Sequence, residues 1–411
     1  MNGLRFGNEI RWLFQTALLM FLVTIGLGMA RGIGLVDFES RNQTLTHLHS
    51  GTIGWVTLGI LASVLWLYGG REAPRPGDRF VRWSVLLLVV SVPLYLLAWW
   101  TGNLPFRAVS GTAVLLGIVL LVGWVVREAA GIGYRRLTTP RLGAVIGLVT
   151  LVIGSTLGVL LQVQYAANQA FLPEGAVPAH AETQVSAYLI LVAMSLIYWQ
   201  LHGDDRTRRG TWMVWLFFAG GAIIAISLLA NQVQGSAAYI PLDLAAFVLF
   251  LTLAWRSVLM PGWFKADSKR HFAVAIPFAF LFLGIFIFLI VGFAVLQIWK
   301  DFSEVPDNLI PASEHPLFVG MVTNILFGML LELNRQRRTF WPWADHVVFW
   351  GVSLGALALT LTLLADQEQF LPFVTPVLGL SILTGIVTHF VRLSMGSAPA
   401  IEPAPGGVVG G

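Results

Sequence analysis

Residues 45–55 read LTHLHSGTIGW and place two histidines, His47 and His49, near the start of a long apolar run. An α-helix turns by about 100° per residue, so two side chains two positions apart point roughly 200° away from each other. The two rings therefore cannot both bind one metal ion from a regular helix. Either they serve two centres on opposite sides of the helix, or one is a ligand and the other supports it.

Two further histidines, His180 in PAHAETQ and His315 in SEHPLFVG, occupy similar places at the start of apolar runs. Imidazole is a good ligand for heme iron, copper and zinc. The chain has no cysteine, which excludes thiolate metal sites and iron–sulfur clusters. A polar side chain in a membrane is costly unless it has a partner. The four histidines are thus candidate metal ligands, and the alternative is that they are interfacial residues without a ligand.

Two glycines, Gly51 and Gly54, follow the histidine pair in the same run. Small residues at these positions either let a flat macrocycle approach the helix or let another helix pack closely. The sequence alone leaves both interpretations open.

The composition places the whole chain in a membrane. Its 411 residues are 56% hydrophobic and only 11% charged, and the mean hydropathy is +0.77, whereas soluble domains carry about 25% charge. The lipid bilayer is therefore an expected partner. The net charge of +4 is no sign of nucleic-acid binding, because the basic residues flank the apolar runs, and we expect no nucleic-acid partner.

Twelve apolar runs are long enough to cross a bilayer, which takes about 20 residues per helix. They are too long for strands, and Leu, Ala and Gly dominate them. The sequence predicts an all-α membrane protein of twelve transmembrane helices in a single domain, residues 1–394, followed by a disordered tail, residues 395–411. The runs are 12–35, 46–68, 81–101, 107–126, 142–165, 180–201, 211–232, 239–256, 272–298, 315–334, 345–365 and 371–394.

The distribution of Lys and Arg predicts how the spans are oriented. Of the 25 basic residues, the loops after odd-numbered spans hold only Arg31, Arg41, Arg107 and Lys300. Because cytoplasmic loops carry the excess of Lys and Arg, both termini are expected in the cytoplasm. The four candidate histidines then lie at the outer ends of spans 2, 6 and 10, which predicts a threefold pseudo-repeat of four helices. The other histidines lie at inner ends and are interpreted as solvated or interfacial: His202, His271, His346 and His389.

The segment THLHSGTIGWVTLGILASVLWLYG resembles the tenth helix of subunit I of the cbb-type heme–copper oxidases, which carries an H-x-H-S-G-x-x-G-W run. By this resemblance His47 is the axial ligand of a high-spin heme and His49 a ligand of a low-spin heme. In a shifted register, His180 is the second low-spin ligand and His315 a copper ligand. The NnrS family of twelve-span heme–copper membrane proteins is closer in length.

The chain also departs from the oxidase pattern. The adjacent His-His pair of the oxidase copper site is missing, and Gln184 and Val319 stand four residues after His180 and His315, where neither is a tyrosine. The resemblance therefore implies a protein of a bacterial inner membrane with one or two b-type hemes, copper being a second candidate metal. Such a protein handles electrons, nitric oxide or oxygen, and a cytochrome on the outer side is a candidate partner. If it is an enzyme, it is an oxidoreductase.

Three other functions stay open at this point. Twelve spans with both ends inside is a common transporter topology, and a fold alone does not assign a function; the sequence shows no convincing ionisable site near the midplane, where transporters bind their substrates. Three histidines, His49, His180 and His315, could instead hold one copper or zinc ion. The chain could also be a membrane scaffold or assembly partner.

Overall fold

The computed structural model describes residues 3–36, 40–72, 75–259, 264–299 and 304–395, and within these ranges the chain is helical and has no β-strand. The predicted disordered tail, residues 395–411, lies outside the described residues except for Met395. The all-α prediction is confirmed for the described part of the chain.

Twelve helical spans are long and apolar enough to cross a membrane, and each contains most of one predicted run. The predicted number of spans is confirmed for the described residues. The spans are α1 (Gly7–Gly32), α2–η1–α3 (Arg41–Gly69), α4 (Arg79–Trp100), α5 (Leu104–Ile132), α6 (Thr139–Ala167), α7–η4–α8 (Ala176–His202), α9 (Arg208–Leu229), η5–α10 (Val233–Val258), α11–η6 (Ser268–Val295), α12–η8–α13 (Leu309–Leu333), α14 (Pro342–Leu364) and η10–α15 (Glu368–Ser394).

Several spans begin earlier than the apolar pattern predicts, because polar residues continue the helix outward. Ser40 caps α2 by accepting a hydrogen bond from the Gln43 backbone N–H at 3.3 Å. The polar segment RNQTLT therefore forms the first turns of this span. As a result, His47 and His49 lie within the helix, in its second and third turns, rather than at its first residue.

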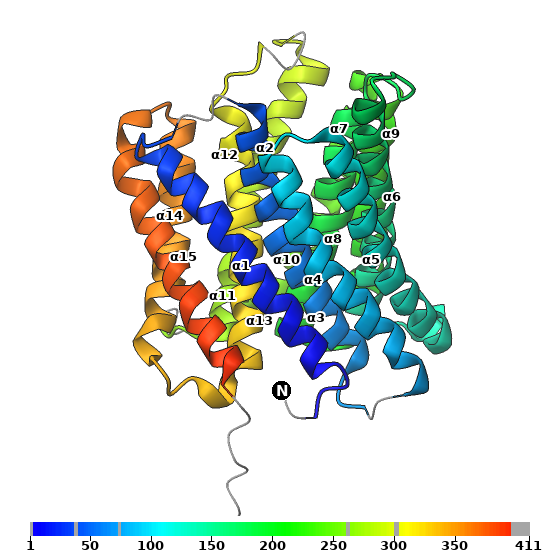
Figure 1. Ribbon diagram of the computed structural model, residues 1–411, viewed down its shortest axis with the longest axis vertical. Helices are drawn as coiled ribbons and strands as arrows, with labels where there is room; N and C mark the ends of the chain where they lie inside the picture. The colour runs from blue at the N-terminus through cyan, green and yellow to red at the C-terminus, as the bar shows by residue number, and fades with distance from the viewer. Residues whose placement is uncertain (1–2, 37–39, 73–74, 260–263, 300–303, 396–411) are drawn as a thin grey trace, which may run out of the picture.

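The first described residues and the end of α15 lie at the same end of the bundle (Figure 1). We call this the proximal end, and the opposite end, where α2, α7 and α12 begin, the distal end. An even number of spans requires the two chain ends to lie together. Which side of the membrane the proximal end faces is still a prediction.

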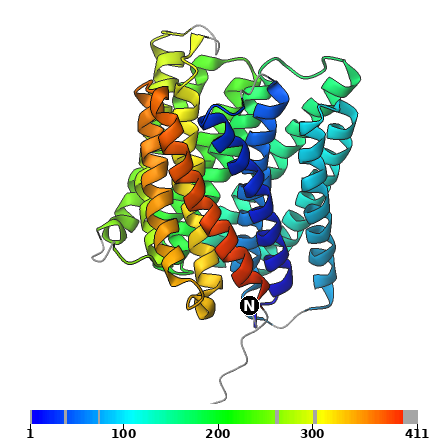
Figure 2. The same cartoon turned by 60° about the vertical axis from the view of Figure 1, so that its left-hand side comes forward.

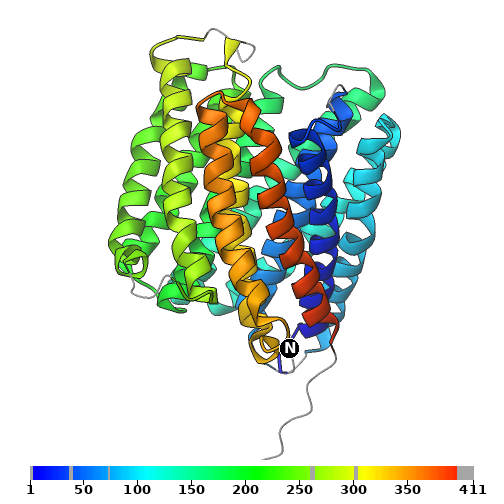
Figure 3. The same ribbon diagram turned by 90° about the vertical axis from the view of Figure 1, so that its left-hand side faces the viewer.

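Three spans are far more buried than the others. In an 18-residue apolar stretch of each span, 78%, 72% and 78% of the residues are buried in Arg41–Gly69, Ala176–His202 and Leu309–Leu333, against 33–50% in the other nine. Figures 2 and 3 show the bundle from two further sides, with α14 and α15 covering the outside of the Leu309–Leu333 span. The three spans that carry the candidate histidines therefore form the centre of the bundle.

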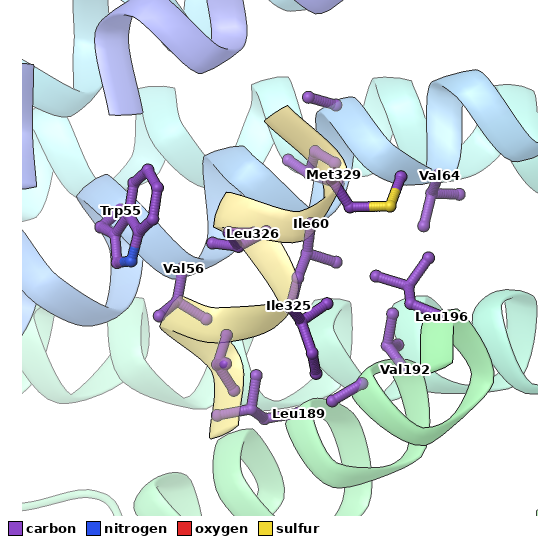
Figure 4. Close-up of a cluster of buried hydrophobic side chains, with 14 of the residues drawn as sticks. Trp55, Val56, Ile60, Val64, Leu189, Val192, Leu196, Ile325, Leu326 and Met329 are labelled. Atoms are coloured by element: carbon purple, nitrogen blue, oxygen red, sulfur yellow. The ribbon is translucent and has the colours of Figure 1, made fainter. Parts of the chain in front are cut away.

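The three central spans pack directly against each other through aliphatic side chains. In Figure 4 these buried side chains meet between the spans, with Val192 and Leu196 close to Ile60 and Val64. A close-packed core of this kind holds its helices rigidly relative to one another. The labelled residues are Trp55, Val56, Ile60, Val64, Leu189, Val192, Leu196, Ile325, Leu326 and Met329.

Each central span contains a π-helical segment just after its histidine. The segments are Ser50–Thr57, Thr183–Leu189 and Pro316–Thr323, so their first residues are spaced by 133 positions each time. The Thr57 hydroxyl donates to the Thr52 carbonyl, five residues back, and Thr323 does the same to Phe318, both at 2.9 Å. Such segments are rare and often occur at functional sites.

Candidate functional site

His49 is held by its own helix and by an aromatic neighbour on α4. Its Nδ1 lies 2.7 Å from the Leu45 carbonyl oxygen, and its ring stacks on Trp99 with centroids 4.4 Å apart. Because a carbonyl oxygen only accepts, Nδ1 carries the hydrogen and Nε2 keeps its lone pair. Nε2 makes no hydrogen bond to any described residue. This is the arrangement of metal-binding histidines, whose other ring nitrogen is held by a carbonyl.

His180 has the same chemistry but reaches across to the preceding span. Its Nδ1 lies 2.8 Å from the Gly154 carbonyl oxygen of α6, and in the described structure its Nε2 also lacks a hydrogen-bond partner. The ring lies against Gly158, where a Cβ atom would come within 2.6 Å of the ring Cε1. The glycine is thus required for the observed ring position.

His47 repeats the geometry of His180 on the first two spans. Its Nδ1 lies 3.0 Å from the Thr24 carbonyl oxygen of α1, and its ring lies against Gly28, where a Cβ would be 3.0 Å from Cε1. In both cases the glycine stands four residues after the residue whose carbonyl accepts. His315, by contrast, resembles His49, because its Nδ1 lies 2.7 Å from Pro311 of its own helix.

The four histidines fall into two pairs. His49 is within electrostatic range of His180, and His47 is within electrostatic range of His315. His47 contacts α1 while His49 contacts α4, so the prediction that the two rings point in different directions is confirmed. No group of three or more His, Asp or Glu side chains among the described residues is placed to hold one metal ion, which argues against a single three-histidine site.

A cavity of about 810 Å³ connects His49 and His180. This volume is in the usual range for sites that bind small molecules and cofactors. Much of the wall is apolar and comes from the second, fourth, fifth and sixth spans. The apolar lining includes Leu48, Ile53, Val56, Val114, Ile118, Leu151, Val159, Val185 and Leu189.

The distal mouth of the cavity carries a buried cation without a counter-ion. Arg107 is 6% exposed, and its guanidinium lies 4.3 Å from the centroid of the Trp99 ring. None of the described acidic side chains forms an ion pair with it, and the one hydrogen bond of its guanidinium to a described residue is to the Gly102 carbonyl at 3.5 Å. A buried charge without a partner is costly. The site is therefore suited to a ligand with an anionic group at this end.

Other polar atoms of the cavity wall also lack hydrogen-bond partners in the described structure, namely the Gln162 Oε1 and the Tyr188 hydroxyl. Buried polar groups are normally satisfied by the protein, by ordered water or by a ligand. The cavity therefore combines two imidazole rings, apolar walls and, among the described residues, several polar groups without partners.

The two glycines after the histidine pair face α1 and do not line the cavity. A Cβ at Gly54 would come within 2.5 Å of Met20, and one at Gly51 within 3.3 Å of Thr24. Of the two interpretations left open by the sequence, close helix packing accounts for these contacts.

Two of the inner histidines are not solvated. His271 and His389 are 0% and 1% exposed, so their interpretation as solvated or interfacial residues is wrong, whereas His202 and His346 are exposed. The His271 Nδ1 donates to the Asn324 Oδ1 at 2.8 Å, because the Asn324 amide nitrogen is already bonded to the Gly320 carbonyl. A central span thus shields His271 from solvent, which a pattern of basic residues at helix ends does not reveal.

Sequence reasoning missed several residues of the site. Tyr95 lines the cavity with its ring centroid 6.0 Å from that of His49. Tyr95, Trp99 and Gly158 carry no local motif, and Arg107 was counted only as a basic residue of an outer loop. The position of Arg107 was an available signal, since basic residues are scarce on that side of the predicted topology.

No family model matches the sequence, and no curated protein matches it. The case for a function therefore depends on the geometry of the site.

Proposed function

We propose that this chain is a membrane heme protein that binds a b-type heme between His49 and His180. The observation that carries the proposal is that both rings line one cavity of about 810 Å³ with an Nε2 that has no described partner. Heme iron is commonly held by histidine, and a backbone carbonyl on the other ring nitrogen fixes the ring and its tautomer. The donor set fits this group.

The rest of the cavity fits a porphyrin as well. Its apolar walls match the macrocycle, and Arg107 with Arg41 at the distal mouth would pair with the acidic side groups of a b-type heme. A bound heme would supply a redox-active iron. The chain itself contributes the two oriented imidazoles, the exclusion of water by packed side chains, and a cationic end.

A threefold pseudo-repeat of four helices would account for the second histidine pair, His47 and His315. The π-helical segments start 133 residues apart, and the same spacing aligns His47 with His180 and with Ser313. It also aligns His49 with Glu182 and His315. In this register, His49 of the first repeat meets His180 of the second, and His315 of the third meets His47 of the first. The same histidine pairing thus occurs between the first and second repeats and between the third and first repeats.

His47 and His315 are accordingly proposed as a second metal centre, with heme iron or copper as the metal. Both have an Nδ1 held by a carbonyl oxygen. The first centre is proposed for electron transfer and the second for electron transfer or for chemistry on nitric oxide or oxygen. The location proposed is a bacterial inner membrane with both termini in the cytoplasm, and a cytochrome at the distal side is the proposed electron partner.

The test is a reduced-minus-oxidised absorption spectrum with metal analysis on the purified protein. We expect a Soret band that shifts on reduction, loss of the low-spin component in His49→Ala and His180→Ala, and an effect of His47→Ala on the other component only. The matched control is His202→Ala, because His202 is exposed and outside the site. A folded protein without iron, or unchanged spectra in all these variants, would falsify the proposal.

The runner-up function is secondary transport without heme. Its support is a membrane-buried carboxyl group, Asp243, which the sequence analysis did not single out. Uptake of a solute into proteoliposomes by a preparation without heme, with the histidine variants retaining normal uptake, would favour this alternative over the heme proposal.

A further inference from the structure

The proposed register assigns a third position between the second and third repeats. At this third position, Glu182 of the second repeat corresponds to His49 of the first repeat and His315 of the third. Ser313 of the third repeat corresponds to His47 of the first repeat and His180 of the second. No histidine pair exists at this third position. The neighbouring eighth span instead presents two buried polar side chains, Tyr239 and Asp243, one helical turn apart on α10.

Asp243 is enclosed on all sides. It is 0% exposed, and neither of its carboxyl oxygens makes a hydrogen bond to a described residue. Gly220 of α9 leaves the room for it, since a Cβ at that glycine would come within 2.2 Å of the Asp243 Oδ1. The Tyr239 hydroxyl is also fully buried and without a hydrogen bond in the described structure.

The ionisable groups within electrostatic range of Asp243 are Tyr239 and Glu182, and none of the described Lys, Arg or His side chains acts on it. Glu182 itself accepts a hydrogen bond from the Ser186 hydroxyl at 2.7 Å. An ionised carboxylate in apolar surroundings is very costly without a cation or several donors. A neutral carboxylic acid carries no such cost. The environment therefore favours the protonated form of Asp243.

We propose that Asp243 is a proton-binding site within the membrane, next to the unpaired hydroxyl of Tyr239. In the protonated state the carboxyl is neutral. On deprotonation the O–H bond breaks, the electron pair stays on the carboxylate, and the proton binds to solvent water at the distal end. Both residues lie in the first turns of α10 (Tyr239–Val258), whose span begins at the distal end, so only a short part of the span separates them from that side. This inference does not depend on a bound heme.

The test is infrared difference spectroscopy of the full-length protein in lipid vesicles. We expect the wild type minus Asp243→Asn spectrum at neutral pH to contain the carbonyl stretch of a neutral carboxylic acid, shifted in D₂O. The asparagine variant should fold, because its side chain has the shape of the neutral acid. The matched control is Glu174→Gln in an exposed distal loop, which should remove an ionised carboxylate band instead.

A pH titration of the same samples then tests proton exchange. The carboxylic acid band should disappear reversibly as the pH rises above neutral, and Tyr239→Phe should move the midpoint of that loss while the band itself persists at low pH. Three results would overturn the proposal: an ionised Asp243 at neutral pH, carboxylate bands that respond to exchange of Na⁺ or K⁺ for a bulky organic cation, or an acid band that never titrates. Because the readout is the carboxyl group, failure of the heme proposal leaves this result unaffected.

Discussion

The rings of His49 and Trp99 stack with centroids 4.4 Å apart and planes 21° apart. The same indole lies 4.3 Å from the Arg107 guanidinium carbon. Trp99 therefore links the candidate metal ligand to the buried cation at the cavity mouth. The three residues come from three different spans, so this contact also joins α4 and α5 to the central span that carries His49.

The first prediction concerns the unpaired cation. Arg107→Gln keeps a polar side chain but removes the charge, so the anionic groups of the proposed heme would lose their partner. We expect heme to bind at least tenfold more weakly, which is about 1.4 kcal/mol. The measurement is the heme-to-protein ratio and the rate of heme loss after purification. Arg127→Gln is the control, since the Arg127 side chain is 60% exposed; equal heme retention in both variants would contradict the assignment.

The second prediction concerns the glycine under the His180 ring. Gly158→Ala places a Cβ within 2.6 Å of the ring Cε1, so the ring must move. We expect the low-spin spectrum to weaken or disappear. Gly123→Ala is the control, because a Cβ there meets nothing within 4 Å. Since alanine is a better helix former than glycine by about 1 kcal/mol, a spectral loss at Gly158 alone would have to come from the contact with His180. Identical spectra in both variants would count against this role.

The third prediction is a pH dependence of stability at the proximal end. Burial alone would raise the pKa of Asp78, but hydrogen bonds from the Arg5 guanidinium, 2.6 and 2.9 Å long, and from the Arg75 backbone N–H outweigh it and hold the pKa below its usual value. A carboxyl with a lowered folded-state pKa stabilises the fold above its unfolded pKa of about 3.9, and this contribution is lost as the pH falls through the folded value.

Asp78→Asn should therefore lower the thermal midpoint at pH 7, by the equivalent of about 1.5–3 kcal/mol for hydrogen bonds to a charged group. The difference from wild type should shrink as the pH falls below about 4. Thermal unfolding in detergent at several pH values measures both effects. A difference that stays constant over this range would show that the carboxylate charge is not the cause.

The fourth prediction concerns a buried ion pair near the end of the last span. Arg392 is 0% exposed and donates to the Asp345 Oδ1 at 2.6 Å and to the Phe340 carbonyl at 2.7 Å. Removing one partner leaves the other charge buried and unpaired, which costs about 3–5 kcal/mol. We expect Asp345→Ala to lower the thermal midpoint strongly and Glu174→Ala, at an exposed position, to leave it nearly unchanged. Similar midpoints for both variants would refute the importance of the pair.

Much of the fold could be predicted from the sequence because membrane insertion depends on local hydrophobicity. Each of the twelve predicted runs falls mostly within one observed span. The start of α2 was predicted too late, because helix capping by Ser40 extends the helix through polar residues that the hydrophobic pattern does not register.

The candidate site was only partly predictable. The chain order identified His47, His49, His180 and His315 as a set, since a histidine in an apolar run is unusual at any position. It did not identify Trp99, Arg107 or Gly158, because their roles depend on which helices are neighbours. The chain order also did not distinguish the buried His271 from the exposed His346. Burial depends on which neighbouring span covers a residue, and not on the residue's own helix.

The sequence by itself determined that this chain has twelve runs long and apolar enough to cross a membrane and that imidazoles lie near the ends of three of them, because both facts depend only on the order of residues along the chain. The tertiary structure alone decided that His49 shares a cavity with His180, that Arg107 lies there without a counter-ion among the described residues, and that the carboxyl group of Asp243 is enclosed without a hydrogen bond to any of them. These are relations between side chains on different helices, and they arise only when the helices pack and set which faces meet.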